Sequence, residues 1–265
     1  MLRRCTFVGA PLRRRSNIFQ LARHVSGGSS AAPGFFELRT DHVQPSELAT
    51  YLETQEDIAR GELEGWKGMW HTELGGTVGC VHHLYHWRDY DQRDGALDRL
   101  SDHDALFLAH PETLQSSRAV VMVEATDCLA SCGLPGAAGF TTPAPAEAAV
   151  GVVAPLVCWE LRTYQLQLGY DTVPKFFALY GEGLKDKLAA DTSGASSLAT
   201  LLYSDCGSLN VVMELWRHES LQRAQDSRRA SRAAPKWRAA IGEIATLATS
   251  FDTQYLRPTP SSPWC

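Results

Sequence analysis

The chain of 265 residues lacks any uninterrupted apolar run near the roughly 18 to 20 residues that a membrane-spanning helix needs, so we expect no transmembrane segment. Cysteine is also scarce. Seven cysteines, an odd number with no secretory signal before them, do not make a disulfide framework and favour a reduced compartment. The composition, 44% hydrophobic and 21% charged, is that of a globular protein and excludes disordered and collagen-like classes.

Acidic residues are missing from residues 1–34, and the first carboxylate is Glu37. This segment carries six arginines among scattered apolar residues, namely Arg3, Arg4, Arg13, Arg14, Arg15 and Arg23. The pattern is typical of a mitochondrial transit peptide, and we expect a leader and flexible stub over 1–34, cleavage near Val25/Ser26, and a location in the mitochondrial matrix. A disordered basic tail is the alternative, with the protein in the cytosol.

The rest of the chain is acidic. Six of the 25 basic residues lie in the leader, which leaves 19 basic against 30 acidic residues and a net charge of −11. A surface of this sign offers no basic patch that could neutralise phosphates, so we expect no nucleic-acid partner.

An internal repeat organises this acidic body. The segment 36–40 (FELRT) reappears as 159–163 (WELRT), at an offset of 123 residues. The segment 81–85 (VHHLY) corresponds to 212–216 (VMELW), at an offset of 131. Two matched blocks in the same order indicate a duplicated unit. We therefore divide the body into a first repeat over 35–126, an Ala/Gly/Pro-rich linker over 127–155, a second repeat over 156–258 and a tail over 259–265.

Each copy has strand and helix patterns in the order βαββαβ, which is that of the ferredoxin-like plait. In the first copy we expect strands over 35–40, 66–74, 77–87 and 118–125, and helices over 46–63 and 91–108. In the second copy we expect strands over 158–163, 198–205, 209–216 and 251–256, and helices over 170–190 and 220–248, interrupted at Pro235.

A sheet with both helices on one face leaves the other face uncovered, and two such sheets in one chain can pack face to face. The predicted fold is therefore an α+β barrel built from two halves. Because alternate side chains share a face, we expect Phe36, Leu38, Trp159 and Leu161 to meet the helices. The alternate set is then expected to line the space between the sheets, and consists of Glu37, Arg39, His83, Tyr85, Trp87, Glu160, Arg162, Glu214 and Trp216.

These nine residues, here called the candidate set, are the best candidates for ligand binding. Their arginines could hold an anionic or carbonyl-bearing ligand, and His83 could act as acid or base. The same residues also describe a charge network without a ligand, which we favour because buried charges need partners. No catalytic residue is assigned, since the chain has no Gly-x-Ser-x-Gly elbow and no catalytic cysteine signature.

Metal sites are not expected. His82 and His86 share one face of their strand while His83 lies on the other, so the three cannot converge. Cys128 and Cys132 have no second Cys or His pair at a suitable distance. No cofactor is therefore predicted.

The first hairpin resembles that of the NipSnap family. The segment 70–76 (WHTELGG), followed by Val81, 83–85 (HLY), Trp87 and 89–90 (DY), is similar to the pattern of that family's first repeat. The segment 37–40 (ELRT) with 45–46 (PS) resembles its opening strand and helix start, and 214–216 (ELW) with 219–220 (ES) resembles its second repeat.

The chain departs from that family at two points. The linker with Cys128 and Cys132 is longer and richer in Ala, Gly and Pro, and Glu214 stands where a histidine is more usual. The second departure argues against a symmetric role for His83.

The resemblance implies a dimeric α+β barrel fold, a mitochondrial association, and a role in organelle quality control and vesicle or membrane traffic. It implies mitochondrial or autophagy-related protein partners and a homo-oligomer, and supplies no reaction. The alternative is a small-ligand or haem-binding barrel, monooxygenase-like by analogy with other barrels of this architecture.

Overall fold

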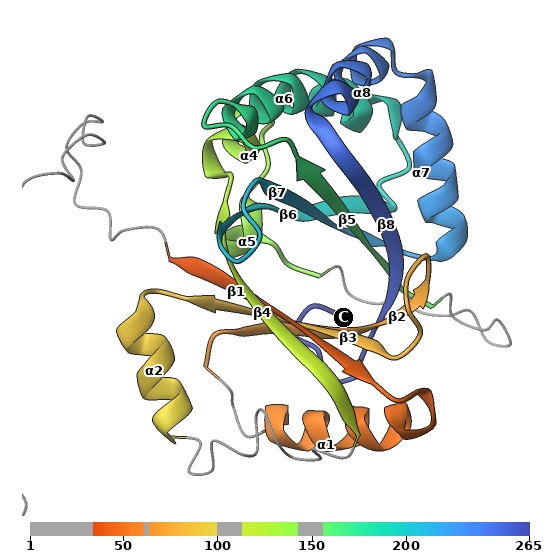
Figure 1. The fold of residues 1–265 in the computed structure, drawn as a ribbon. Coiled ribbons are helices and arrows are strands. Elements are labelled where there is room, and N and C mark those ends of the chain that lie inside the picture. Colours follow the sequence, from red (N-terminus) through yellow and green to blue (C-terminus); the bar gives the residue numbers. More distant parts are fainter. Residues whose placement is uncertain (1–33, 61–63, 100–112, 143–155) are drawn as a thin grey trace, which may run out of the picture. The chain divides into compact units, whose positions relative to one another are not determined.

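The computed structural model describes residues 34–60, 64–99, 113–142 and 156–265 (Figure 1). The expected leader, apart from Gly34, and the second part of the expected linker lie outside the described residues. So does the C-terminal end of the helix expected over 91–108.

The first half follows the expected order of elements. Its strands are β1 (Phe35–Val43), β2 (Trp66–Leu74), β3 (Cys80–Trp87) and β4 (Leu114–Glu124). Its helices are η1 (Pro45–Glu47), α1 (Leu48–Arg60) and α2 (Tyr90–Arg99). Gly75 adopts a φ of +82° in the turn between β2 and β3, which confirms the predicted hairpin.

The second half repeats this order. Its strands are β5 (Cys158–Leu166), β6 (Ser196–Cys206), β7 (Val211–His218) and β8 (Ala248–Pro258). Its helices are α6 (Thr172–Ala190), α7 (Leu221–Ala233) and α8 (Pro235–Leu247). Pro235 opens α8, so the expected interruption is the boundary between two helices.

The eight strands form one closed antiparallel barrel in the order β1-β3-β2-β8-β5-β7-β6-β4. Each half contributes the order of a ferredoxin-like sheet, β4-β1-β3-β2 or β8-β5-β7-β6. The predicted α+β barrel built from two halves is confirmed. The halves are joined where β2 pairs with β8 and β4 pairs with β6. These pairs join residues 70–74 to 255–258 and residues 121–124 to 202–206, and they close the sheet into a barrel.

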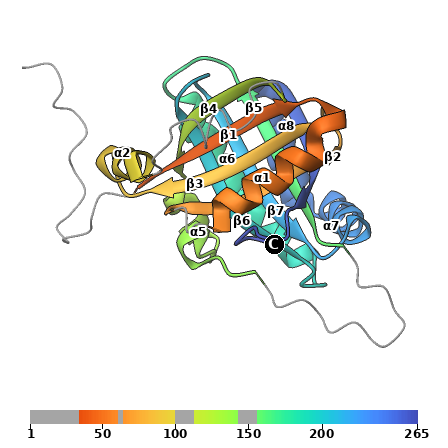
Figure 2. The same ribbon diagram turned by 90° about the horizontal axis from the view of Figure 1, so that it is seen from below.

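The helices lie outside the barrel, on opposite sides for the two halves. Helices α1 and α2 cover the first-half strands, and α6, α7 and α8 cover the second-half strands (Figure 1). Seen from the first-half side, α1 runs across the strands of its own repeat (Figure 2). Among the described residues, no helix is both long and apolar enough to span a membrane.

The barrel interior holds the residues that we expected to face the helices. Phe36, Leu38, Trp159 and Leu161 belong to one buried cluster with residues from both halves. The ring centroid of Trp159 lies 5.2 Å from that of Trp70 and 6.0 Å from that of Trp264. The sets that share a face were therefore predicted correctly, but their assignment to the two faces was wrong. A sealed barrel of eight strands is filled by side chains, so its apolar set lies inside.

The segment expected as the start of a linker has structure of its own. It forms the short helices α4 (Thr126–Ser131) and α5 (Gly136–Gly139). Leu129 is buried in the cluster beneath α6, and the ring of Phe140 contacts those of Trp159 and Trp264. This part of the connection thus contributes to the core, which its Ala/Gly/Pro-rich composition did not indicate.

Candidate functional site

All nine residues of the candidate set are buried between the sheet and its helices. They divide into two clusters that correspond through the repeat, with Arg39 opposite His83 on β1 and β3, and Arg162 opposite Glu214 on β5 and β7. The first-half cluster is Glu37, Arg39, Asp41, Tyr51, Gln55, His83, Tyr85, Trp87 and Arg93. The second-half cluster is Glu160, Arg162, Tyr164, Lys187, Glu214, Trp216, His218 and Arg228.

Arg39 is the centre of the first-half cluster. Its Nε lies 3.0 Å from Oδ2 of Asp41, and its Nη2 donates to Oε1 of Gln55 at 3.2 Å. The same Nη2 lies 3.2 Å from Nε2 of His83. The hydroxyl of Tyr51, from α1, donates to Oδ2 of Asp41. Side chains of α1 therefore fill the space over this arginine.

The first-half charges compensate one another. Burial alone would raise the pKa of Asp41, but its contacts with His83 and Arg39 hold that pKa well below the usual range. Burial and the charge of Arg39 lower the pKa of His83 to about 4. His83 is therefore neutral at pH 7.

Glu37 closes the other end of this cluster. Its Oε2 accepts from Nε1 of Trp87 at 3.1 Å and from Nε of Arg93 at 2.6 Å, and its Oε1 accepts from Nη2 of Arg93 at 3.1 Å. Tyr85 stacks between His83 and Trp87, with ring centroids 6.4 Å and 5.8 Å away. The carboxylate thus has a bidentate arginine partner from α2.

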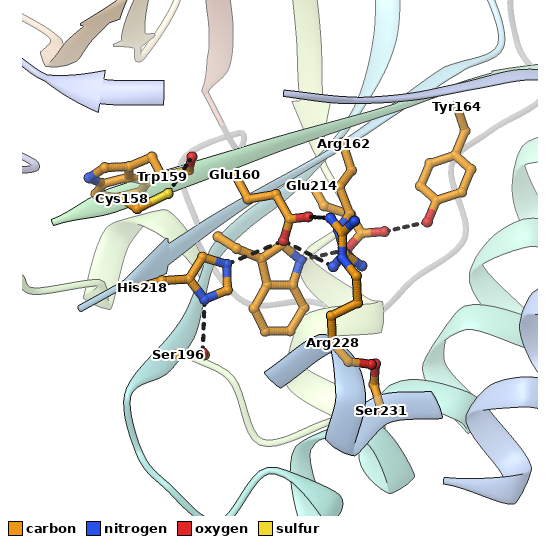
Figure 3. Close-up of polar contacts among 11 residues, drawn as sticks. Cys158, Trp159, Glu160, Arg162, Tyr164, Ser196, Glu214, His218, Arg228 and Ser231 are labelled. Atoms are coloured by element: carbon orange, nitrogen blue, oxygen red, sulfur yellow. Dashed lines mark hydrogen bonds and ion pairs between the residues drawn. The ribbon is translucent and has the colours of Figure 1, made fainter. Parts of the chain in front are cut away.

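Glu160 and Glu214 both lie beside Arg162, and Glu160 also pairs with Arg228 (Figure 3). Oε2 of Glu160 lies 2.9 Å from Nη2 of Arg162 and 3.2 Å from Nε2 of His218, and Arg228 reaches its Oε1 from α7. Glu214 accepts from the hydroxyl of Tyr164 at 2.7 Å and from Nε1 of Trp216 at 2.5 Å.

Arg162 lies between these two carboxylates. Burial opposes its charge, but Glu214 and Glu160 raise its pKa above the usual range. Burial would raise the pKa of Glu160, and the charge of Arg162 with the hydrogen bond from His218 lowers it instead. The pair is therefore fully ionised at neutral pH.

Lys187 of α6 completes the second-half cluster. Its side chain is 2% exposed, and its Nζ lies 3.5 Å from the ring centroid of Trp216 and 4.8 Å from that of Trp237. The described residues offer this ammonium no hydrogen-bond partner. Burial and then the positive charge of Arg162 lower its pKa to about 7, although Glu214 opposes that shift. Two indole faces are its main contacts.

A cavity of about 290 Å³ adjoins the second-half cluster, between α7 and α8 on one side and β5 and β8 on the other. Its lining consists of Arg162, Tyr164, Arg228, Ser231, Arg232, Trp237, Ile241, Ile244, Ala245, Ala248, Phe251 and Thr253. One part of this lining is cationic and another is apolar.

A wider groove of about 850 Å³ lies where α4 and the start of α6 meet the ends of β4, β6 and β7. Its lining includes Val123, Ala125, Cys128, Leu168, Tyr170, Val173, Phe177, Tyr203 and Leu209. Leu168 is 84% exposed, and Tyr170 is fully exposed. The groove therefore presents large apolar side chains to solvent.

The two thiols of α4 face α6. Sγ of Cys128 lies 3.7 Å from the carbonyl oxygen of Phe177, and Sγ of Cys132 lies 3.4 Å from that of Gly181. Burial raises the pKa of Cys128 to about 11, so this cysteine is a thiol at neutral pH. Within the described parts of the chain, no three His, Cys, Asp or Glu side chains gather as a metal site would require.

The sequence reasoning missed the partners that the helices supply. Tyr51 and Gln55 are one turn apart on α1, and Lys187 lies three residues after the buried Leu184 on α6. A polar residue on the apolar stripe of a helix is the signal that could have found them. Arg93 and Arg228 carry no such signal, because arginines are common on exposed helix faces.

Comparisons with known proteins agree with this architecture. The NIPSNAP family model matches residues 159–263, which cover most of the second repeat and part of the tail. The chain is 27% identical over 238 residues to Protein NipSnap homolog 3A from Homo sapiens, covering 86% of this chain and 85% of that one. It is also 27% identical to Protein NipSnap homolog 3B from Mus musculus over 238 residues, with the same coverage.

Solved structures show the same fold at low sequence identity. A monooxygenase-like protein from Lactobacillus acidophilus NCFM has a TM-score of 0.55 at 10% identity, covering 85% of this chain and 94% of that one. A similar protein from Fusobacterium nucleatum has a TM-score of 0.56 at 10% identity, covering 86% and 94%. Identity this low relates the folds alone.

Proposed function

Because this chain belongs to the NipSnap family, we propose that it acts in mitochondria through contacts with other proteins, in organelle quality control and vesicle or membrane traffic. It carries out no reaction of its own in this proposal. The observation that carries the proposal is the mutual compensation of the candidate set. Glu37, Glu160 and Glu214 each already accept hydrogen bonds from buried protein donors.

The side chain best suited to chemistry is likewise occupied. Nε2 of His83 lies within hydrogen-bond distance of both Arg39 and Tyr51, at 3.2 Å and 3.1 Å. A general base needs a free nitrogen within reach of the substrate proton. This arrangement supports a structural role for the cluster.

The groove around Leu168 and Tyr170 is the surface that we assign to protein contacts. Aromatic and large apolar side chains that are exposed together are enriched at protein interfaces. Leu209, 52% exposed, and the half-buried Phe177 extend the same surface.

Proximity labelling in cells tests this assignment. The wild-type chain and a Val78→Asp control, altered at an exposed apolar residue of the β2–β3 turn, should label the same set of mitochondrial proteins. A Leu168→Asp/Tyr170→Asp double variant should lose that set. Identical labelling by all three proteins would exclude the groove as the contact surface.

The mitochondrial address rests on the arginine-rich, acid-free segment 1–34. A reporter fused to these residues should enter mitochondria. Replacement of the six arginines by glutamate should abolish import, because the membrane potential acts on their positive charge. A cytosolic reporter in both cases would refute the proposed address.

A haem-binding, monooxygenase-like barrel is the second candidate, and the residues fit haem poorly. The cavity beside Arg162 has no His or Cys in its described lining, and the hydroxyl of its Tyr164 already donates to Glu214. Haem iron needs an axial His, Cys, Met or Tyr ligand. An absorbance titration of the purified chain with haem, with no change in the haem spectrum, would remove this candidate.

A further inference from the structure

We propose that the cavity between α7, α8, β5 and β8 binds a small amphiphilic carboxylic acid, with its carboxylate among the arginines and its tail against α8. This inference goes beyond the protein contacts proposed above and does not depend on them. The cavity of about 290 Å³ is near the lower end of the range for small-molecule sites, which favours a free acid with a single short tail.

The polar end of the cavity is built for an anion. Arg162 lines it from β5, its side chain is 9% exposed, and its Nε has no hydrogen-bond partner among the described residues. Arg228 and Arg232 line the same cavity from α7, and the lining contains no carboxylate. Guanidinium groups bind carboxylates with charge-assisted and often bidentate hydrogen bonds.

The charges around the cavity leave an excess of positive sign. Arg162 and Arg228 are balanced by Glu160 and Glu214, which lie behind them. Arg232 adds a third guanidinium to the lining. A single carboxylate would offset this excess.

The apolar end of the cavity suits an aliphatic tail. Ile241, Ile244 and Ala245 come from α8, and Trp237 lies one turn before them. Phe251 of β8 stacks on Tyr164 with ring centroids 4.4 Å apart and is 52% exposed. Because Phe251 is half exposed, the cavity is open to solvent beside this ring, and an aliphatic tail can enter there.

The surroundings of the equivalent arginines, Arg39 and Arg162, explain why we assign this site to the second repeat. In the first-half cluster, Tyr51 and Gln55 of α1 occupy the position over Arg39, and Gln55 accepts from its Nη2. In the second-half cluster, the guanidinium of Arg162 instead borders the cavity. The helix that follows β5, as α1 follows β1, is α6, which supplies Lys187 to the cluster, whereas the cavity lies on the side of α7 and α8.

Calorimetric titration of the full chain with decanoate, below its micelle concentration, tests the charge requirement. We expect saturable 1:1 binding of decanoate and at least about tenfold weaker binding of 1-decanol, which has the same chain without the charge. Equal affinities for the two compounds, or no saturable binding of decanoate, would overturn the proposal.

Two variants of the cavity lining and one control variant test whether decanoate binds in this cavity. Ala245→Phe adds bulk to the lining and should reduce decanoate affinity by more than about tenfold, and Arg232→Gln should reduce it about fivefold. The control is Arg229→Gln on the same helix, since Arg229 is 63% exposed, pairs with Asp226 and does not line the cavity. It should bind decanoate as the wild type does. Wild-type affinity in Ala245→Phe, or equal losses in the two arginine variants, would show that the acid binds elsewhere.

Discussion

The two clusters contain similar side chains, but equivalent positions of the two repeats supply different ones. In the first half, the carboxylate beside Arg39 is Asp41, two residues along the same strand, and the neighbouring strand supplies the neutral His83. In the second half, the position that matches Asp41 is Tyr164, and the position that matches His83 is Glu214. Arg162 therefore has two carboxylate neighbours, Glu160 on its own strand at 2.9 Å and Glu214 on the next strand at 3.7 Å.

Each arginine nevertheless keeps a carboxylate that accepts from a tyrosine hydroxyl. Tyr51 of α1 donates to Asp41, and Tyr164 of β5 donates to Glu214. The second tyrosine comes from the sheet, whereas the first comes from a helix. The comparison teaches that a buried arginine requires a compensated anion, while the element that supplies it can change.

The largest expected effect concerns the barrel interior, where the halves are alike. Trp159→Ala should lower the free energy of unfolding by about 4 to 5 kcal/mol and Phe36→Ala by about 3 to 4 kcal/mol, because both leave a cavity in a shared core. Chemical denaturation measures both. A loss below about 1 kcal/mol in either variant would place that ring outside the core.

A matched pair of substitutions compares how much the buried carboxylates of the two clusters contribute to stability. Glu160→Ala should cost about 3 to 4 kcal/mol, since Arg162 and His218 are buried and lose their partner. The matched Glu37→Ala should cost about 1 to 2 kcal/mol, because Arg93 is 25% exposed and can turn to water. Equal losses by denaturation would mean that the two clusters are energetically equivalent.

Alkaline pH should separate the two clusters through Lys187. Its pKa is about 7 in the folded chain against an ordinary value of 10.5, so the unfolded chain binds the extra proton between these values. Stability therefore rises with pH in this window. From pH 7 to 9.5 the wild type should gain about 3 kcal/mol relative to Lys187→Met, measured by denaturation at each pH.

The control for this titration is Lys185→Met, at an exposed position of the same helix. It should leave the pH dependence unchanged. A wild type and Lys187→Met with parallel profiles would show that this ammonium keeps its ordinary pKa.

Mildly acidic pH should act on the first-half cluster through His83. Its pKa of about 4 lies below the ordinary 6.5, so the unfolded chain takes up the proton first and stability falls as pH decreases from 6.5 to 4. Between pH 7 and 5.5 the wild type should lose about 1 kcal/mol relative to His83→Asn. His42→Asn, outside the cluster, should follow the wild type. A His83→Asn profile parallel to the wild type would instead show that His83 keeps its ordinary pKa in the folded chain.

The strands and their pairing were predictable from the sequence because a two-residue period and two repeat offsets determine them. The offset of 131 residues placed His83 and Glu214 at equivalent positions, and the register confirms it. The orientation of each face was not predictable. Both faces of β1 and β5 carry large side chains, and the charged face is buried only because Arg93, Lys187 and Arg228 reach it from helices.

The barrel was predicted, but the strand pairs that close it, β2 with β8 and β4 with β6, were beyond the sequence pattern. Alternation tells which side chains share a face, but it carries no information about whether two sheet edges meet. The position of the cavity beside Arg162 was unpredictable for the same reason. It depends on the approach of α7 and α8 to β5 and β8, over distances in the chain that no local pattern records.

The two strand pairs that join the repeats, β2 with β8 and β4 with β6, govern how the chain can fold. Residues 70–74 of β2 pair with residues 255–258 of β8, which lie 181 to 188 positions later in the chain of 265 residues. During synthesis or import, the first repeat therefore has two unsatisfied edges until the last strand emerges. Such long-range pairing gives a high contact order, slow folding and exposure to aggregation, and it joins both repeats in one cooperative transition. A chaperone that holds the first repeat until the second arrives would act on this interval.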